Sequence, residues 1–352
     1  MKALLNILTL IVTVVIALAT CVTYYSSYIE PDKLGTFVLI QYAFPYLWVV
    51  NIIVLVLQVI LRPNWRIAIP VLAAIVTFNG AISVFNISTS DIPKDKKTIK
   101  VLTYNVHYMS MAPIDSIGSF LEAQNADILC LQECDARNYK KIKKWVKAYP
   151  YMLAHSAKKK KNISGDKQLL LSKYPIKENR LGGDIDTYIQ RAEVTIGGEK
   201  ITILNCHLAS IGLHSEEIKV FDPSLLPEQE KSNVKKQLKT THNKMRDAYH
   251  RRQEQTRDIA KTIESISTPI LLCGDFNDTP ISYTYQVVHK RGMKDSFIEA
   301  GNGLGNTYNG NLPPIRIDYI WHTDDMEAVY YKEHRVEYSD HFPVCATIVL
   351  KD

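Results

Sequence analysis

The chain has 352 residues, which is enough for one large domain or two ordinary ones. Its 42 basic and 36 acidic residues give a net charge of +6, too small an excess to indicate a nucleic-acid-binding protein by itself. Its six cysteines have no CxxC or other paired spacing, so they indicate neither a zinc site nor a disulfide framework.

Residues 1–88 are predicted to form a membrane region. They contain three apolar stretches, from Leu4 to Tyr25, from Thr36 to Leu61 and from Ile67 to Phe85. Each approaches or exceeds the ~20 residues that a helix needs to cross ~30 Å of hydrocarbon. A cleaved signal peptide would explain the first stretch but not the other two. We therefore expect three transmembrane helices, followed by a polar linker over residues 89–97.

The basic residues predict the orientation of this region. With three spans, the N-terminus and the second connector share one side of the membrane, and that side carries Lys2, Arg62 and Arg66. The first connector has only Lys33, flanked by acids. Basic residues favour the cytoplasmic side, so residues 98–352 are expected to be extracytoplasmic. The lysine-rich linker argues for the opposite orientation.

Residues 98–352 alternate between strand-like and helix-like segments. The expected helices cover residues 113–125, 135–149, 241–266 and 281–290, and residues 212–240 are expected to be a polar insertion. The Gly197-Gly198 pair between two strand-like runs predicts a hairpin. Many strands with short helices between them predict an α/β domain with two packed sheets.

Polar side chains gather where the predicted strands begin or end. In chain order they are Asn105, His107, Glu133, His207, Asp275, Asn277, Asp318, Asp340 and His341. If the strands lie side by side, these groups meet at one rim, where the carboxylates repel one another unless a cation neutralises them. Mg²⁺ is bound by one or two carboxylates together with waters and substrate phosphate oxygens. The set therefore predicts metal-assisted hydrolysis of a phosphate ester.

Six motifs in this order resemble the endonuclease/exonuclease/phosphatase superfamily, which has the DNase-I-like fold. They are YNVH (104–107), LQE (131–133), NCHL (205–208), GDFN (274–277), RIDYI (316–320) and SDH (339–341). The resemblance covers about residues 98–350. It implies a four-layer α/β sandwich, with two mixed sheets flanked by helices, as a catalytic domain over residues 98–352. The three expected transmembrane helices would make this chain a membrane-anchored member.

The resemblance also implies a metal site that uses Mg²⁺ or Mn²⁺. Glu133 would be the principal metal ligand, with Asn105 beside it, and Asp340 would be a further ligand of the metal or its waters. Asp275 and Asn277 would bind the scissile phosphate and position or activate the attacking water.

The histidines complete the implied catalytic set. His341 would contact the phosphate or act as general base, with Asp318 accepting from its other ring nitrogen to fix the tautomer. His207 would donate to a non-bridging phosphate oxygen. Whether Asp275 or His341 takes the proton stays open. Arg252 is interpreted as a structural residue of its helix.

Two positions depart from the family pattern. His107 stands where nuclease members often have aspartate, which weakens a DNA-repair interpretation. Lys167 replaces the usual glycine before the LLLSKYPI strand, which puts the geometry on the substrate side in doubt.

The leading hypothesis is a membrane-anchored, metal-dependent phosphoesterase acting on a phosphodiester or a phosphomonoester. Its substrate would be a lipid-derived head group, a small phosphodiester or nucleic acid. One alternative is a metal-dependent endonuclease or exonuclease that acts on extracytoplasmic nucleic acid. Another is a non-catalytic membrane protein that binds a phosphorylated ligand. The sequence indicates no protein partner.

Overall fold

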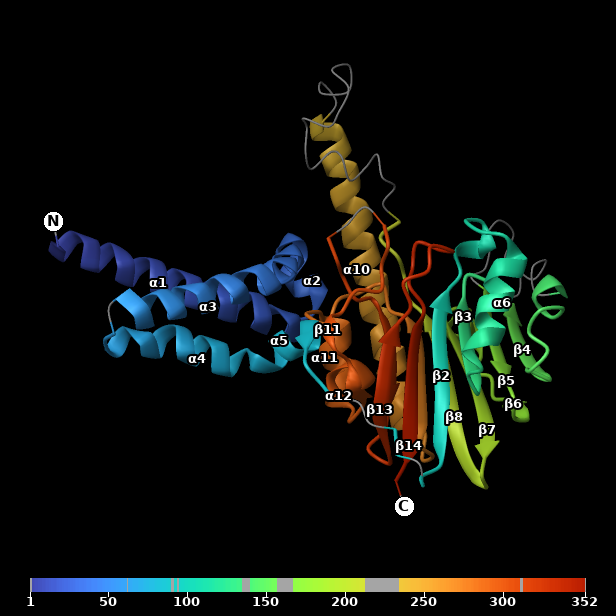
Figure 1. The fold of residues 1–352 in the computed structure, drawn as a ribbon. Helices are drawn as coiled ribbons and strands as arrows, with labels where there is room; N and C mark the ends of the chain where they lie inside the picture. The colour runs from blue at the N-terminus through green and yellow to red at the C-terminus, as the bar shows by residue number, and fades with distance from the viewer. Residues whose placement is uncertain are drawn as a thin grey trace.

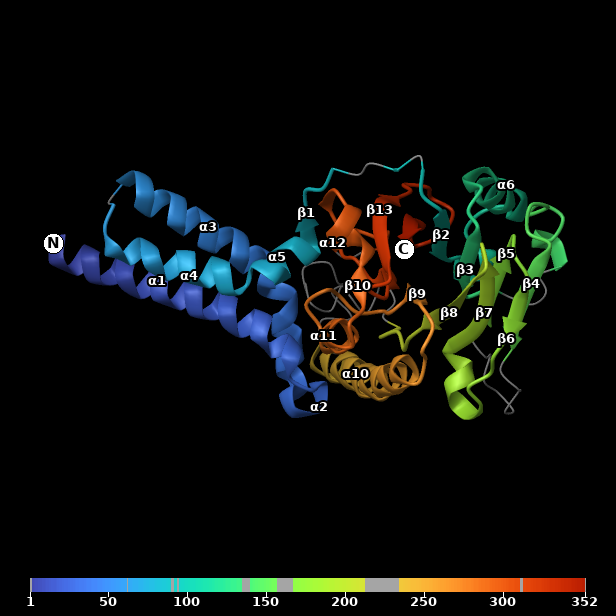
Figure 2. The same ribbon diagram turned by 90° about the horizontal axis from the view of Figure 1, so that it is seen from below.

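Two mixed β-sheets packed face to face form the centre of the region that follows the N-terminal helices (Figures 1 and 2). The computed structural model describes residues 2–61, 63–89, 92–93, 95–134, 140–156, 167–212, 234–310 and 313–351. Within them, one sheet has the order β13-β14-β2-β3-β5-β4 and is called the β2 sheet. The other has the order β10-β12-β9-β8-β7-β6 and is called the β9 sheet.

The strands of the β2 sheet are β2 (Thr98–Asn105), β3 (Ile128–Gln132), β4 (Tyr151–Ser156), β5 (Lys167–Ser172), β13 (Met326–Glu333) and β14 (Val344–Leu350). Those of the β9 sheet are β6 (Ile176–Glu178), β7 (Ile189–Ile196), β8 (Glu199–His207), β9 (Ile270–Asp275), β10 (Lys294–Asp295) and β12 (Asp318–His322). The pairs β2–β3 and β8–β9 are parallel, and the other neighbours are antiparallel.

Side chains of the central strands point alternately into the core between the two sheets and towards the outer helices. In β2, Val101 packs between the two sheets, whereas Leu102 packs on the outer face under helix α6 (Ile114–Gln124). In β9, Leu271 points between the sheets, and Leu272 packs towards the helices of the other outer layer. Successive side chains of a strand point to opposite faces, so buried runs of this kind need cover on both sides. The predicted four-layer sandwich is confirmed.

The outer helices lie close to the ranges predicted from the sequence, with local differences. Helix α6 matches the predicted 113–125 segment and ends at Asn125 in the left-handed conformation. The predicted 281–290 helix is α11 (Tyr283–Lys290). A short helix, α12 (Ser296–Ala300), follows it.

Helix α10 (Val234–Glu264) begins earlier than the sequence predicts. The end of the predicted polar insertion is therefore helical, and residues 213–233 lie outside the described part. Polar composition hid this helix, because its first turns lack the apolar face that the sequence pattern requires. The predicted Gly197-Gly198 hairpin is confirmed, since it joins β7 to β8.

The predicted helix over residues 135–149 is wrong for most of its described part. Residues 140–142 are helical and turns follow, while 135–139 lie outside the described residues. Ile142 and Val146 are buried as expected, but Trp145 is 43% exposed. Lysines four residues apart in this stretch, such as Lys140 and Lys144, repel each other on a helix surface and disfavour its continuation.

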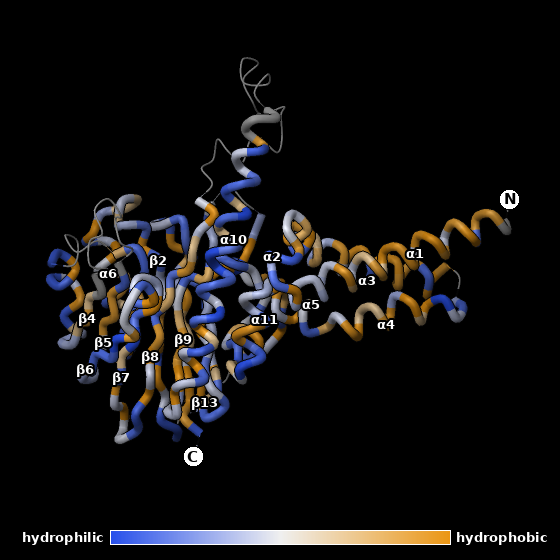
Figure 3. Tube along the Cα trace, turned by 180° about the vertical axis from the view of Figure 1, so that it is seen from behind, coloured by the Kyte–Doolittle hydropathy of each residue, from blue (hydrophilic) through white to orange (hydrophobic). Residues whose placement is uncertain are grey.

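The N-terminal region forms an apolar helical bundle that projects from one side of the sandwich (Figures 1 and 2). Its members are α1 (Lys2–Tyr25), α3 (Phe44–Leu61) and α4 (Ala68–Val76), and Figure 3 shows them as largely hydrophobic. Two segments, Leu4–Tyr28 and Pro31–Leu61, are long and apolar enough to cross a membrane. The third predicted stretch is bent by 58° between α4 and α5 (Phe78–Val84), so the candidate spans number two or three.

The bend occurs at Thr77, whose hydroxyl donates to the Ala73 carbonyl at 2.7 Å. A threonine bonded back to the preceding turn bends helices. At the far end of the bundle, Arg66 donates to the Asn6 carbonyl at 2.9 Å. The second connector therefore lies beside the start of α1, away from the sandwich (Figure 1).

The bundle is attached to the sandwich by backbone pairing as well as by side chains. Strand β1 (Phe85–Asn86) pairs with β11 (Gly303–Leu304), immediately after α5. At the first connector, Asp32 of α2 (Pro31–Leu34) accepts from Gln253 of α10 at 2.8 Å. The chain at the predicted boundary near residue 88 is thus already bonded to the sandwich, and Ser88 donates to the Glu299 carbonyl.

Candidate active site

Strand polarity brings the predicted polar residues to one edge of the two sheets. In the β9 sheet, β8 and β9 run parallel with His207 opposite Asp275, and antiparallel β12 places Asp318 opposite Asp275 as well. In the β2 sheet, parallel β2 and β3 place Asn105 opposite Gln132, directly before Glu133. Because the carboxyl ends of parallel strands meet at the same edge, residues distant in sequence become neighbours.

Gly274 makes the close approach of β8 and β9 possible. Its φ is +137°, and a Cβ built there would lie 1.9 Å from the Cys206 carbonyl oxygen. Only glycine fits such a contact. The glycine of the GDFN motif therefore sets the backbone from which the Asp275 carboxylate is presented.

Asp275 is the centre of the cluster and is buried. Its carboxylate accepts from the Asn105 amide at 3.0 Å, and from the Asn277 backbone N–H at 2.8 Å and side-chain amide at 3.0 Å. The Asn105 amide also donates to Glu133 at 3.2 Å, so one amide joins carboxylates that belong to different sheets. His207 Nε2 lies 3.5 Å from Glu133 Oε1 and 3.6 Å from Asp275 Oδ2.

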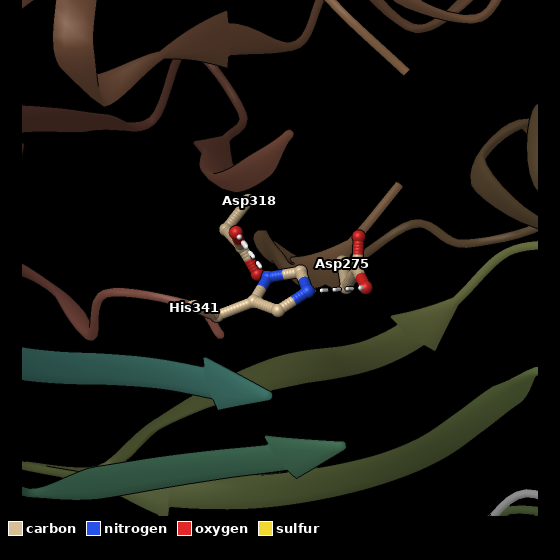
Figure 4. Close-up of side chains that lie close together, drawn as sticks. All are labelled: Asp275, Asp318 and His341. Carbon is tan, nitrogen blue, oxygen red and sulfur yellow. Dashed lines mark hydrogen bonds and ion pairs between the residues drawn. The ribbon is translucent and has the colours of Figure 1, made fainter. Parts of the chain in front are cut away.

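His341 stands between two aspartates (Figure 4). Its Nδ1 lies 2.9 Å from Asp318 Oδ2, and its Nε2 lies 3.7 Å from Asp275 Oδ2. Burial disfavours the imidazolium, but the carboxylates of Asp318 and Asp275 outweigh burial and raise the pKa of His341. Burial also raises the pKa of Asp318. The ring is packed at its other side by Tyr308, edge to face at 5.4 Å between centroids.

Asp340 and Glu133 lie nearer the solvent and share a neighbour, His107. His107 Nδ1 is 3.2 Å from Asp340 and 3.9 Å from Glu133. The contact with Asp340 raises the pKa of His107. His107 and Glu133 have φ values of +42° and +51°, and Asn277 also has +51°. Such backbone strain in residues other than glycine clusters at functional sites.

The donor set fits a hard divalent cation. Glu133, Asp275 and Asp340 offer carboxylate oxygens at one edge, and Glu133 and Asp340 are only partly buried, so a hydrated ion can reach them. Burial raises the pKa of Glu133, and the nearby charge of Asp275 adds to it, as expected for crowded carboxylates that need a counter-charge. Asp318 Oδ1 is buried and has no hydrogen-bond partner among the described residues. Ligand atoms of Asp275, Asp318 and His341 also lie within 4.8 Å of one another, but Asp318 is already engaged by His341.

Asn105 was predicted to lie beside the metal as a ligand, but its side-chain oxygen does not face the carboxylates. Its amide NH₂ points to the carboxylates, and its Oδ1 accepts from the His107 backbone N–H at 3.0 Å. For Oδ1 to bind a cation, the amide would have to rotate and give up that bond. In this arrangement Asn105 holds Glu133 and Asp275 together.

A buried polar network beneath the site was not assigned from the sequence. Gln132 donates to Asn205 Oδ1 at 2.7 Å, and Asn205 donates to Gln190 at 3.1 Å, which ties the two sheets together. Both lie inside the six motifs: Gln132 is directly before Glu133, and Asn205 is two residues before His207. A polar side chain within an otherwise apolar strand is the signal that could have found them.

Arg252 of α10 supports the loop after β9. This buried side chain donates to the Asn277 carbonyl and, at 3.3 Å, to that of Ala209. Arg252 Nε lies 3.8 Å from Asp278 Oδ2, and the guanidinium carbon lies 4.5 Å from the centroid of the Tyr249 ring. Its contacts are to the protein backbone and neighbouring side chains, in agreement with the structural interpretation.

All eight predicted site residues thus lie within this connected cluster. Asp275 and Glu133 are joined through Asn105, and His207 lies close to both. Asn277 and His341 contact Asp275, and Asp318 binds His341. Asp340 is linked through His107, to which we assigned no catalytic or metal-binding role from the sequence.

Comparisons with known proteins identify the family and the fold. The sequence profile described as the endonuclease/exonuclease/phosphatase family matches residues 102–341, and a domain of unknown function matches residues 5–84. No curated protein sequence matches the chain.

Solved structures share the fold at low sequence identity. An endonuclease/exonuclease/phosphatase from Bacteroides vulgatus is 18% identical with a TM-score of 0.53, covering 73% of this chain and 100% of that one. A counterpart from Beutenbergia cavernae is 16% identical with a TM-score of 0.51, covering 73% and 72%. One from Bacteroides thetaiotaomicron is 16% identical with a TM-score of 0.51, covering 73% and 100%. With its profile match over most of the chain and the same sandwich fold, the chain belongs to the endonuclease/exonuclease/phosphatase family.

Proposed function

We propose that this protein is a membrane-anchored, divalent-metal-dependent phosphoesterase that hydrolyses a phosphodiester or a phosphomonoester. The observation that carries the proposal is the convergence of Glu133, Asp275 and His341 at one edge of the sandwich, joined through the Asn105 amide and flanked by His207. Family membership supports phosphoester chemistry in general.

Glu133 and Asp340, with Asn105 beside them, would hold the metal ion. A bound Mg²⁺ or Mn²⁺ supplies charge neutralisation of the phosphate oxygens and lowers the pKa of a coordinated water. The remaining chemistry belongs to side chains fixed by the fold.

Asp275 and Asn277 position the attacking water and one phosphate oxygen in this proposal. Donors from Asn105 and Asn277 fix the Asp275 carboxylate, so its geometry does not depend on the substrate. Asp275 accepts the proton of the water. His341, held at Nδ1 by Asp318, offers Nε2 to the phosphate, and His207 donates to a non-bridging oxygen. Fixed donors aimed at developing charge are the largest contribution in many hydrolytic sites.

The test is hydrolysis of bis(p-nitrophenyl) phosphate and p-nitrophenyl phosphate by the full-length protein in detergent. We expect turnover with Mg²⁺ or Mn²⁺, its loss in EDTA and its return when metal is added. Asp275→Asn and His341→Gln should each lower kcat by about 10²–10⁴-fold, the range for a lost acid–base group. Asp324→Asn, at an 80% exposed side chain, is the control and should keep the wild-type rate.

Activity that persists in EDTA, or in both variants, would contradict the assignment. Binding of a phosphate ester without turnover would favour a non-catalytic receptor instead. Preferential cleavage of DNA or RNA over small diesters would favour a nuclease.

We also propose that the bundle crosses the membrane, with the sandwich on the extracytoplasmic side. The contact of Arg66 with Asn6 supports placing the basic N-terminal end and the second connector together, away from the sandwich. Protease added to intact expressing cells should then cleave the catalytic region. Cleavage only after the cells are opened would reverse the orientation.

A further inference from the structure

An apolar pocket of about 440 Å³ lies between the membrane bundle and the sandwich. From the membrane region it is lined by Leu39 and Tyr42, in the segment between α2 and α3. From the sandwich it is lined by Ile211, Met245, Ile281 and Ile315. We call it the junction pocket. Protein interiors are normally close-packed, and an apolar cavity of about 150 Å³ already binds small hydrocarbons. A pocket of this size falls in the range of ligand sites, roughly 300–1,000 Å³.

Polarity distinguishes the junction pocket from the candidate active site. Among its described lining residues, the one with a formal charge is Arg316. Arg316 is buried and bonded to both oxygens of Asp295 at 2.6 and 3.1 Å, and to the Ser83 carbonyl at 2.8 Å. Its charge is therefore neutralised, and the pocket presents hydrocarbon surface to its contents.

Two segments of chain lead from the junction pocket directly to the active site. Thr279–Ile281 line the pocket and follow Asp275 and Asn277 in the loop after β9. Arg316 lines the pocket two residues before Asp318, which limits the distance between their Cα atoms to about 7 Å.

A third segment makes the same connection through the backbone. Gly305 lines the pocket, and Thr307 and Tyr308 follow it. Thr307 accepts from the Asp318 N–H at 3.0 Å, and Tyr308 forms an isolated β-bridge with His341. A single molecule with a polar head and an apolar tail can therefore reach both places.

We propose that the junction pocket holds the hydrocarbon chain of a membrane lipid while its phosphoester lies at Asp275 and His341. The inference rests on the proposed phosphoesterase function and names its substrate class. The pocket is walled on one side by a bundle that is apolar enough to sit in a bilayer, which is the nearest source of hydrocarbon chains. Tyr46, which also lines the pocket, is 60% exposed.

Two probes test the proposal on the full-length protein in amphipol, which removes free detergent that would compete for the pocket. One is a pair of nitrophenyl phosphodiesters that differ only in an ethyl or a hexadecyl group. The other is a methyl phosphodiester with a long alkyl chain that carries a photoreactive diazirine near its end. Each buried methylene contributes roughly a four-fold gain in binding. We therefore expect at least about a ten-fold lower KM for the hexadecyl ester.

The variant Leu39→Trp fills the junction pocket, and Leu57→Trp places the same bulk on the 49% exposed outer surface of α3. Photolabelling of the wild type should map to residues 39–46, 279–281 and 304–316. Leu39→Trp should lower both this labelling and the preference for the hexadecyl ester by about ten-fold, as expected when a few methylenes lose their site. Leu57→Trp should leave both unchanged. Thermal melting of both variants checks that they are folded.

Labelling spread evenly over the bundle surface, or unaffected by Leu39→Trp, would overturn the lipid-chain assignment. Equal KM values for the two esters would do the same and leave the phosphoesterase proposal standing. Labelling confined to the junction pocket, with neither ester hydrolysed, would support the lipid site and reject the phosphoesterase proposal.

Discussion

Asp318 shows how one residue acts through another at this site. It is buried, and its carboxylate binds Nδ1 of His341, so the free Nε2 faces the space beside Asp275. An imidazole whose tautomer and orientation are fixed in this way is ready to donate or accept at one atom. Asp318 is therefore a positioning residue in the proposed reaction.

The variant Asp318→Asn should lower kcat by about 10²–10⁴-fold, because the amide can hold His341 in the wrong tautomer. KM should change little, because the orientation matters most as charge develops in the transition state. The measurements are steady-state kinetics on bis(p-nitrophenyl) phosphate and the pH dependence of kcat.

Asp324→Asn serves again as the exposed control. An unchanged kcat and pH profile in Asp318→Asn would show that the contact with His341 is structural only. A lower melting temperature with normal kcat would lead to the same conclusion.

At the scale of elements, helix α10 connects the N-terminal bundle with the loop that follows β9. Gln253 bonds Asp32 of the first connector, and the neighbouring Arg252 bonds the Asn277 carbonyl. One turn later along the helix, Gln255 accepts from the Ala209 N–H at 2.8 Å. The loops that follow His207 and Asp275 are thus held by one helix.

Arg252→Met should destabilise the protein by about 3–5 kcal/mol, because Asp278 would remain buried beside it without its counter-charge. Arg252→Lys keeps a positive charge but cannot reach two carbonyls in the same way, so a smaller loss of stability and a clear loss of kcat are expected. Thermal unfolding and kinetics of the detergent-solubilised protein measure both effects.

The matched control is Arg251→Met, which changes an exposed arginine on the same turn of α10. It should leave the melting temperature within about 1 °C, as exposed substitutions usually cost under ~0.5 kcal/mol. If Arg252→Met were equally neutral, the support that α10 gives to the Asn277 loop would be disproved.

At the scale of the whole molecule, the bundle and the sandwich are bonded into one structure. The Asn86 side-chain amide donates to the carbonyls of Phe297, Ile298 and Gly301, at 3.0, 2.7 and 3.2 Å. It thereby supplies a donor at the C-terminal end of α12, where carbonyls run out of partners within a helix, although Phe297 also accepts from the Gly301 N–H at 2.8 Å. Ile281 of the sandwich also packs in one buried cluster with Tyr24 and Phe44 of the bundle.

Asn86→Ala should lower the free energy of unfolding by about 1–3 kcal/mol, the cost of leaving buried carbonyls without a donor. Differential scanning fluorimetry of the full-length protein, or chemical denaturation, measures the loss. Asn302→Ala, at an exposed position after α12, is the control. Equal stability of the two variants would mean that Asn86 does not bind the bundle to the sandwich.

The sequence was sufficient to pick out the residues that meet at the candidate site because strand ends are local features. An apolar run followed by Asp275 or Glu133 identifies a strand and its polar end without reference to the rest of the chain. The same local logic predicted α6 and the Gly197-Gly198 hairpin. It failed for residues 140–149, where lysines four residues apart disfavour a helix, and for the start of α10, whose first turns have too few apolar residues to reveal a helical period.

By itself, the sequence determined the apolar N-terminal region, the alternation of strands and helices, and which side chains could bind a cation and a phosphate. Only the tertiary structure decided that Asn105 turns its amide towards Glu133 and Asp275, that His107 stands beside Asp340, and that the junction pocket lies between the bundle and the sandwich. Hydropathy and strand propensity act between near neighbours along the chain. Side-chain orientation and cavities are set by contacts between segments that meet only after the sheets and the bundle have packed.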